Sequence, residues 1–237
     1  MKLSINKGSN IIEFEVTYSK RKTLAIKIDP SGDVSVAAPK GTSRKAIIDM
    51  VSSKADWIIK KLHEIEARNA QVIKREFVDG ESFMYLGSDY PLQLTINPKL
   101  SKLVVKLDNG RFMVDSPVTD ADVIRSALEA WYRFMAGQYI KSRIDHYRSV
   151  LNVMPNRVTI KEQKTMWGSC SSKNNLNFNW RVMMAPAEVV DYLVVHELCH
   201  LIHHNHSREF WNQVSAILPD YKVRQDWLKK NGAWLIL

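Results

Sequence analysis

The sequence contains the order H-E-x-x-H, formed by His196, Glu197 and His200. On an α-helix, residues four positions apart lie on one face, so this spacing presents two imidazoles together. Imidazoles are common ligands of divalent metals, and a carboxylate beside them can take a proton from a metal-bound water. The pattern therefore predicts a metal site used for hydrolysis, with Glu197 as the general base.

A catalytic zinc site has three protein ligands and keeps one position open, so a third ligand must come from outside the motif. The candidates are His203, His204, His206 and a distant glutamate. In a continued helix, His204 would lie about 12 Å along the axis from His196, too far to share an ion through bonds of about 2 Å. His206 follows His200 at the spacing of the H-E-x-x-H-x-x-G-x-x-H zincins, although His203 replaces the glycine. We therefore expect His196, His200 and His206 to bind one Zn²⁺ ion or another divalent metal.

Trp167 and Gly168 precede the motif in a predicted hairpin. An edge strand near the metal could pair with an extended peptide, and a glycine lets another backbone approach closely. Both are therefore candidate substrate-binding residues, although packing of the tryptophan on the metal helix and a kinked strand explain them equally well. Ligand histidines usually donate their second ring nitrogen to an acceptor, and four acceptors remain open: Asn177, Asn179, Asp191 and Glu209.

The elements that hold the motif are predicted from apolar spacing and capping residues. Pro186 begins a helix through the motif that is almost wholly apolar and is therefore expected to be buried. Asn205 is expected to turn the chain in a left-handed conformation. Ser207 is expected to cap a second helix that ends before Pro219.

Apolar residues occupy every second position over much of 10–39, which predicts antiparallel strands in a small meander. Strand-like stretches return between residues 83 and 114. Helical spacing predicts one helix over about 42–68 and a long helix over about 119–151. No internal repeat is apparent. Further strands are predicted at 158–160 and 176–180.

Ser116-Pro117 ends the β-rich half, so we place a domain boundary near residue 118. The predicted fold class is α+β. A β-rich N-terminal region with one helix, residues 1–118, is expected to pack on a zincin-like catalytic domain, residues 119–237, which contains the buried H-E-x-x-H helix.

Composition limits the possible classes of protein. The 237 residues are 45% hydrophobic and 25% charged, which is typical of a globular protein, and no apolar run predicts a membrane span. Two cysteines give no disulfide framework, and the N-terminus lacks the apolar segment of a secretory signal, so we expect a cytoplasmic location. The net charge of +9 is spread over both halves, which permits nucleic-acid binding without indicating it.

These motifs resemble those of the YgjP-like metallopeptidases, which are related to the WLM and SprT-like zincins. The resemblance covers about residues 18–234, and it implies the same three ligands and the same catalytic glutamate as the spacing does. One departure is Met166, where the family often has arginine. The matching segments are Lys22-Thr23-Leu24, Ala38-Pro39-Lys40-Gly41, Trp167-Gly168-Ser169-Cys170, Asn179-Trp180, Asp191-Tyr192, H-E-L-C-H and Asn205 to Trp211.

The resemblance leaves the substrate open, because WLM and SprT-like enzymes act on proteins, some crosslinked to DNA, whereas members similar to this chain are linked to nucleotide phosphoanhydride hydrolysis. Our leading prediction is a zinc-dependent metallopeptidase that acts on a peptide or protein. The alternative is a metal-dependent nucleoside triphosphate pyrophosphatase or phosphohydrolase. A nucleic-acid-binding module with a structural zinc is disfavoured, because structural sites are usually closed whereas three histidines leave an open position.

Overall fold

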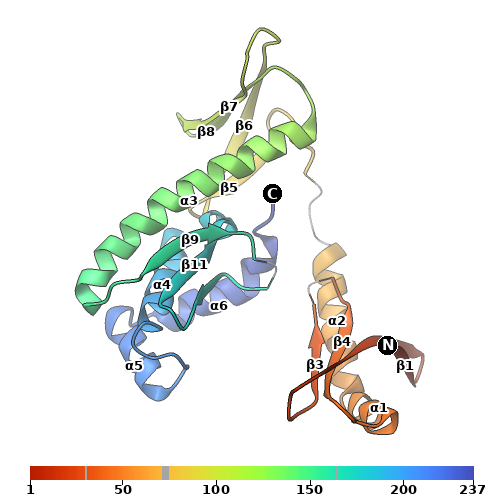
Figure 1. Ribbon diagram of the computed structural model, residues 1–237. Helices are drawn as coiled ribbons and strands as arrows, with labels where there is room; N and C mark the ends of the chain where they lie inside the picture. Colours follow the sequence, from red (N-terminus) through yellow and green to blue (C-terminus); the bar gives the residue numbers. More distant parts are fainter. Residues whose placement is uncertain (30, 71–74, 164) are drawn as a thin grey trace. The chain divides into compact units, whose positions relative to one another are not determined.

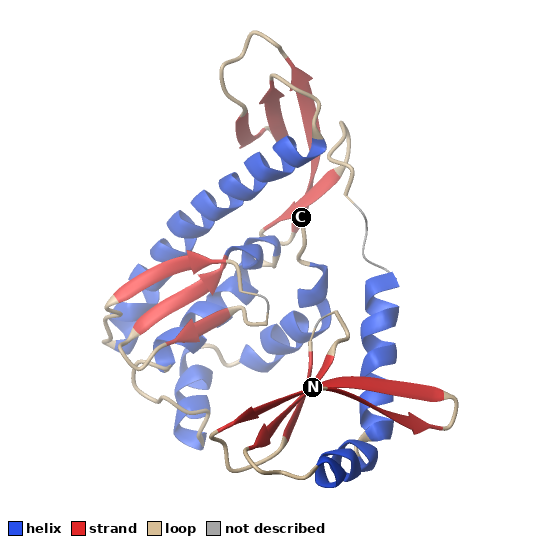
Figure 2. Cartoon of the chain, turned by 45° about the vertical axis from the view of Figure 1, so that its right-hand side comes forward, coloured by secondary structure: helices blue, strands red, loops and turns tan. Residues whose placement is uncertain are grey.

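The computed structural model describes residues 1–29, 31–70, 75–163 and 165–237 (Figures 1 and 2). The fold is mixed α+β, as predicted, and the chain divides into two compact units, residues 1–73 and 74–237. Among the described residues, no helix is both long and apolar enough to cross a membrane.

The first unit is a four-stranded sheet with two helices. Strands β1 (Lys2–Lys7), β2 (Asn10–Ser19), β3 (Ala25–Ile28) and β4 (Val34–Pro39) lie in the order β1-β2-β4-β3, followed by α1 (Arg44–Ser53) and α2 (Ala55–Ala70). Alternate strand residues bury one face of the sheet together with the apolar face of the helices, which accounts for the period-two pattern. The buried set includes Ile12, Phe14, Val16, Val36, Ile47, Val51 and Ile58.

Three details of this unit differ from the sequence prediction. The predicted helix over 42–68 is two helices, because α1 ends at Lys54, where the backbone leaves helical geometry (φ −108°, ψ 6°). The apolar spacing continues across this break because both helices contribute to the same core. The prediction of an antiparallel meander was also wrong, because β2 and β4 pair in parallel and β3 forms an edge of the sheet. Strand β1 was not predicted.

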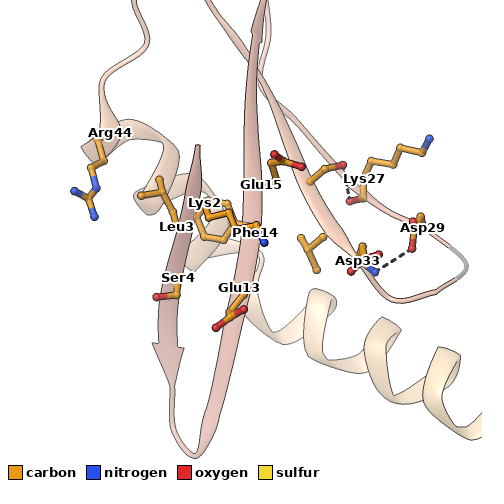
Figure 3. Close-up of a pocket in the computed structure, with 12 residues that line it drawn as sticks. Lys2, Leu3, Ser4, Glu13, Phe14, Glu15, Lys27, Asp29, Asp33 and Arg44 are labelled. Atoms are coloured by element: carbon orange, nitrogen blue, oxygen red, sulfur yellow. Dashed lines mark hydrogen bonds between the residues drawn. The ribbon is translucent and has the colours of Figure 1, made fainter.

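A hollow of about 760 Å³ lies over strands of this sheet (Figure 3). Its lining combines basic residues with acidic residues. This mixture of charges gives the hollow no clear preference for an anion or a cation. The charged lining residues are Lys2, Glu13, Glu15, Lys27, Asp29, Asp33 and Arg44.

The second unit begins with a sheet of the same topology. Strands β5 (Ser82–Tyr85), β6 (Ser88–Ile96), β7 (Val104–Asp108) and β8 (Arg111–Ser116) lie in the order β5-β6-β8-β7, and α3 (Ala121–Leu151) follows. The central strands again pair in parallel, and both first hairpins turn at a positive-φ glycine, Gly8 and Gly87. The structure therefore contains an internal repeat, in which a sheet is followed by a helix, that the sequence prediction missed. The two repeats have few identical residues at equivalent positions apart from those in the turns.

This second sheet packs on α3 and therefore belongs to the same compact unit as that helix. The boundary between the two units lies at residue 73 in the structure, whereas the sequence predicted it near residue 118. The Phe112 ring contacts the Trp131 ring edge-on, with centroids 4.9 Å apart, and the Tyr132 hydroxyl donates to the Met84 carbonyl. Ser116-Pro117 ends a sheet without ending the compact unit, because β5 to β8 share one core with the helices that follow.

Replacing Phe112 with alanine should destabilise the whole second unit by about 3–5 kcal/mol, because the side chain is fully buried between the sheet and α3. Phe134→Ala is the matched control, since Phe134 lies on the same helix as Trp131 and is 62% exposed; its effect should stay within about 0.5 kcal/mol. Thermal unfolding measures both. An equal effect of the two substitutions would contradict the shared core.

The rest of the second unit forms a small sheet and a helical layer. Strands β9 (Arg157–Lys161), β10 (Gly168–Cys170) and β11 (Asn175–Asn179) lie in the order β10-β11-β9, and the short helix η1 (Trp180–Met184) follows. Helix α4 (Ala187–Cys199) contacts α3, β10, α5 (Arg208–Ile217) and α6 (Tyr221–Asn231), and η2 (Gly232–Trp234) ends the fold. Figure 1 shows α4 beneath β9 and β11. Helix α4 is buried along most of its length, as its apolar sequence predicted.

Candidate metal centre

Helix α4 carries the H-E-x-x-H order and is held at its start and along its side. A Cβ on Gly87 would lie 2.8 Å from Pro186 Cα, so only glycine lets the β5–β6 turn contact the residue that begins α4. Along the helix, Asp191 accepts hydrogen bonds from the Arg143 guanidinium and from the Tyr147 hydroxyl, both on α3. These contacts hold the motif against the repeated sheet and the long helix.

The structure brings His196, His200 and His206 together, with one ring nitrogen of each within 4.8 Å of the others. The Nε2 atoms of His196 and His206 lie 3.1 Å apart. Two nitrogens bound to one tetrahedral zinc at about 2.0–2.1 Å lie about 3.3 Å apart, so this separation suits a shared ion. The geometry is thus compatible with the ligand set predicted from the spacing.

The chain reaches His206 through a tight turn that differs from the one predicted. Helix α4 ends at Cys199, and the backbone N–H groups of Ile202 and His203 both donate to the Cys199 carbonyl. Asn205 has no positive φ, so the left-handed turn predicted there was wrong. Ser207 caps α5 through its hydroxyl, which accepts from the Phe210 N–H, as predicted.

A backbone carbonyl orients one of the histidines. His200 Nδ1 lies 2.9 Å from the His203 carbonyl oxygen, which can only accept, so Nδ1 carries the proton and Nε2 keeps its lone pair. None of the four predicted acceptors has this role; Asp191, for example, binds Arg143 and Tyr147 instead. Side-chain chemistry in the sequence could not reveal a main-chain acceptor.

Aromatic rings surround the three histidines, and burial favours the uncharged form of two of them, His196 and His200. Phe210 stacks on His200 with centroids 4.5 Å apart, and Trp211 stacks on His206 at 5.5 Å. Burial lowers the pKa of His196 to about 3, and it also lowers the pKa of His200. At neutral pH these two imidazoles therefore offer lone pairs to a metal without first losing a proton.

Glu197 is buried beside the histidines, with 3% of its surface exposed. Its Oε2 atom has no hydrogen-bond partner among the described residues. Burial raises the pKa of Glu197 to about 8, because the charged form loses its hydration. Burial of a carboxyl group costs free energy, so a carboxyl group that is buried in this way is a candidate functional residue.

A pocket of about 300 Å³ opens beside His196 and Glu197. The predicted substrate-binding residues Trp167 and Gly168 line it, as do residues of α4 and α6 that the sequence prediction missed. The residues of α6 belong to no motif and are distant from His196 along the chain, and those of α4 lie in an apolar run that indicates only burial. The missed lining residues are Tyr192, Leu193, Gln225, Leu228 and Lys229.

Gly168 contacts the candidate base directly. A Cβ at this position would lie 2.5 Å from Glu197 Oε1 and 2.8 Å from Glu197 Cδ, so a larger residue would displace the carboxylate. We expect Gly168→Ala to reduce kcat about a hundredfold, the size of effect that a misplacement of about 1 Å produces. Gly137→Ala is the control, because Gly137 lies in α3, where an added methyl group would meet no other part of the protein within 4 Å. Unchanged kcat in Gly168→Ala would contradict the role of this contact.

Comparison with known proteins identifies the family of this domain. A family model for a metallopeptidase domain matches residues 22–231, which defines a metal-dependent hydrolase. The family is the YgjP-like family, and the chain belongs to it. Such a domain implies a divalent metal, typically zinc.

The other comparisons give less information about this chain than the family model does. A solved structure that is similar to part of this chain is that of the metallopeptidase zymogen of Pyrococcus abyssi abylysin. It is 23% identical, with a TM-score of 0.36, and the alignment covers 38% of this chain and 93% of that chain. No curated protein matches this chain significantly.

Proposed function

We propose that this protein is a zinc-dependent peptidase in which His196, His200 and His206 hold the ion and Glu197 is the general base. The observation that supports this most strongly is the convergence of three histidine nitrogens beside a buried carboxylate. A buried carboxylate without a partner costs free energy, and a bound cation nearby would offset this cost.

The donor set suits zinc, which favours imidazole nitrogen, and other divalent transition metals share this preference. When bound, the ion acts as a Lewis acid that lowers the pKa of water and polarises the scissile carbonyl. Glu197 accepts the proton of the attacking water and returns it to the leaving nitrogen. Glu197 is buried, which limits the access of other water to this carboxylate.

Strand β10 favours a peptide substrate. It pairs with β11 on one side and is the edge of its sheet, and no strand among the described residues pairs with its other side, which could therefore pair with an extended chain. Gly168 is the first residue of β10 and contacts Glu197. An extended peptide paired with this edge would therefore pass close to the general base.

A second candidate function is hydrolysis of a nucleoside triphosphate. One observation favours it, since Lys229 lines the pocket and could attract a phosphate group. The metal ligands and the role of Glu197 are the same in this alternative, and the bond that breaks is a phosphoanhydride.

A screen of the zinc-loaded protein against peptide libraries and the common nucleotides tests both candidates. We expect cleavage of internal peptide bonds that stops with a chelator and returns when zinc is added. Metal-dependent release of phosphate or pyrophosphate without peptide cleavage would replace the first candidate by the second. The absence of both reactions would overturn the proposed function.

A further inference from the structure

Three side chains form a hydrogen-bonded series along one wall of the pocket. The Gln225 Nε2 donates to the Tyr192 hydroxyl at 3.0 Å, and the Lys229 Nζ donates to Gln225 Oε1 at 3.1 Å. All three residues line the same pocket as His196 and Glu197. Tyr192 belongs to the metal helix, whereas Gln225 and Lys229 come from α6.

The donor and acceptor roles in this series follow from the chemistry of its end. An ammonium group can only donate, so Lys229 requires the oxygen of the Gln225 amide to face it. The amide NH₂ group then faces Tyr192, and the phenolic oxygen accepts from it. The Tyr192 O–H is left free to donate elsewhere, and its only hydrogen bond among the described residues is the one it accepts from Gln225.

The pocket offers few other donors beside the reacting groups. Glu197 as a carboxylate can only accept, and the indole nitrogen of Trp167 packs against Gly232, 3.1 Å from a Cβ built there. Lys229 lies at the rim, where its side chain is 64% exposed. Tyr192 is 4% exposed, and its ring centroid lies 5.7 Å from that of His196. A hydroxyl in this position is shielded from bulk water and strengthened as a donor.

We propose that Tyr192 is a catalytic residue that donates a hydrogen bond to the substrate oxygen on which negative charge develops, with Gln225 and Lys229 as positioning residues that keep its O–H free. This inference rests on the proposed hydrolytic function, and it holds for a carbonyl or a phosphoryl oxygen. The phenol stays protonated throughout, and no bond to it forms or breaks. A donor held in place before the reaction stabilises the transition state more than the ground state.

The test compares Tyr192→Phe with wild type in the zinc-loaded protein of residues 1–237. We expect kcat to fall about ten- to a hundredfold with KM changed less than about twofold, because the donor acts mainly in the transition state. Zinc affinity and Tm should stay the same. Tyr132→Phe is the control, since this buried hydroxyl also has one partner but lies outside the pocket, and its kcat should match wild type.

Gln225→Leu tests the positioning role. It should lower kcat several-fold in the wild-type background and have no further effect in Tyr192→Phe, because the two side chains act through one hydroxyl. Full additivity of the two effects would overturn the positioning role, because a purely structural contribution of Gln225 produces that result.

Binding of acetohydroxamate to the zinc-loaded protein gives a readout without turnover. Its oxygens accept hydrogen bonds next to the metal, so Tyr192→Phe should bind it about tenfold more weakly by calorimetry. Equal affinity together with equal kcat would overturn the role of Tyr192. If Glu197→Gln still abolishes turnover in that case, the proposed hydrolytic function stands. Unchanged turnover in Glu197→Gln would instead contradict the proposed function itself.

Discussion

Replacing Glu197 with glutamine should lower kcat by about a hundred- to ten-thousandfold while zinc stays bound. Glutamine has the same shape and fits against Gly168, but its amide cannot take a proton from water. The metal-free variant should be at least as stable as wild type, because burial raises the pKa of Glu197 to about 8 and a neutral amide avoids the free-energy cost of protonating this carboxylate on folding. Steady-state kinetics, zinc titration and thermal unfolding measure the three quantities.

Glu188→Gln is the matched control for this substitution. Glu188 lies in the first turn of the same helix α4, and its side chain is exposed, so the same chemical change there should leave kcat within about twofold of wild type. If Glu197→Gln bound zinc normally and kept wild-type turnover, Glu197 would not be the general base.

Removing His206 should lower zinc affinity by at least about a hundredfold, more than the loss of a residue that only supports a ligand. His206→Ala would leave two ligands, His196 and His200, and too few donors for a tight site. Activity at limiting zinc should disappear and partly return at high zinc. Competition with a chromophoric chelator measures the affinity.

Two neighbouring histidines provide controls for this prediction. His204 is exposed, and His203 contributes its carbonyl oxygen to His200, so neither side chain is expected to bind the ion. His204→Ala and His203→Ala should keep zinc affinity within about threefold of wild type. A large loss of affinity in His203→Ala together with normal binding in His206→Ala would show that the third ligand had been assigned to the wrong residue.

Local patterns in the sequence predicted most of the individual elements. Helix α4 was predicted because its apolar residues, its starting Pro186 and the Ser207 cap of the following helix act within a few residues of one another. Strand alternation was also interpreted correctly in β2 and β4, where one face is buried, although the same pattern in β1 was missed. Capping, helical spacing and alternation are short-range effects, so a single sequence contains them.

Local sequence patterns did not predict how the strands pair or where each compact unit begins and ends. The parallel pairing of β2 with β4 and of β6 with β8 places a later strand between earlier ones. The sheet of β5 to β8 belongs to the second compact unit because it buries aromatic residues against α3. Such contacts depend on surfaces that form only when distant segments meet.

The sequence by itself determined the spacing of the H-E-x-x-H order and the position of His206 along the chain, because helix geometry and short connections are local properties. Only the tertiary structure decided what surrounds these residues. It placed Gly168 against the Glu197 carboxylate, the His203 carbonyl on His200 and Gln225 on Tyr192. The physical reason is that packing of the core decides which donor, acceptor or backbone lies within about 3 Å of a buried polar group, and this neighbour need not be near in sequence.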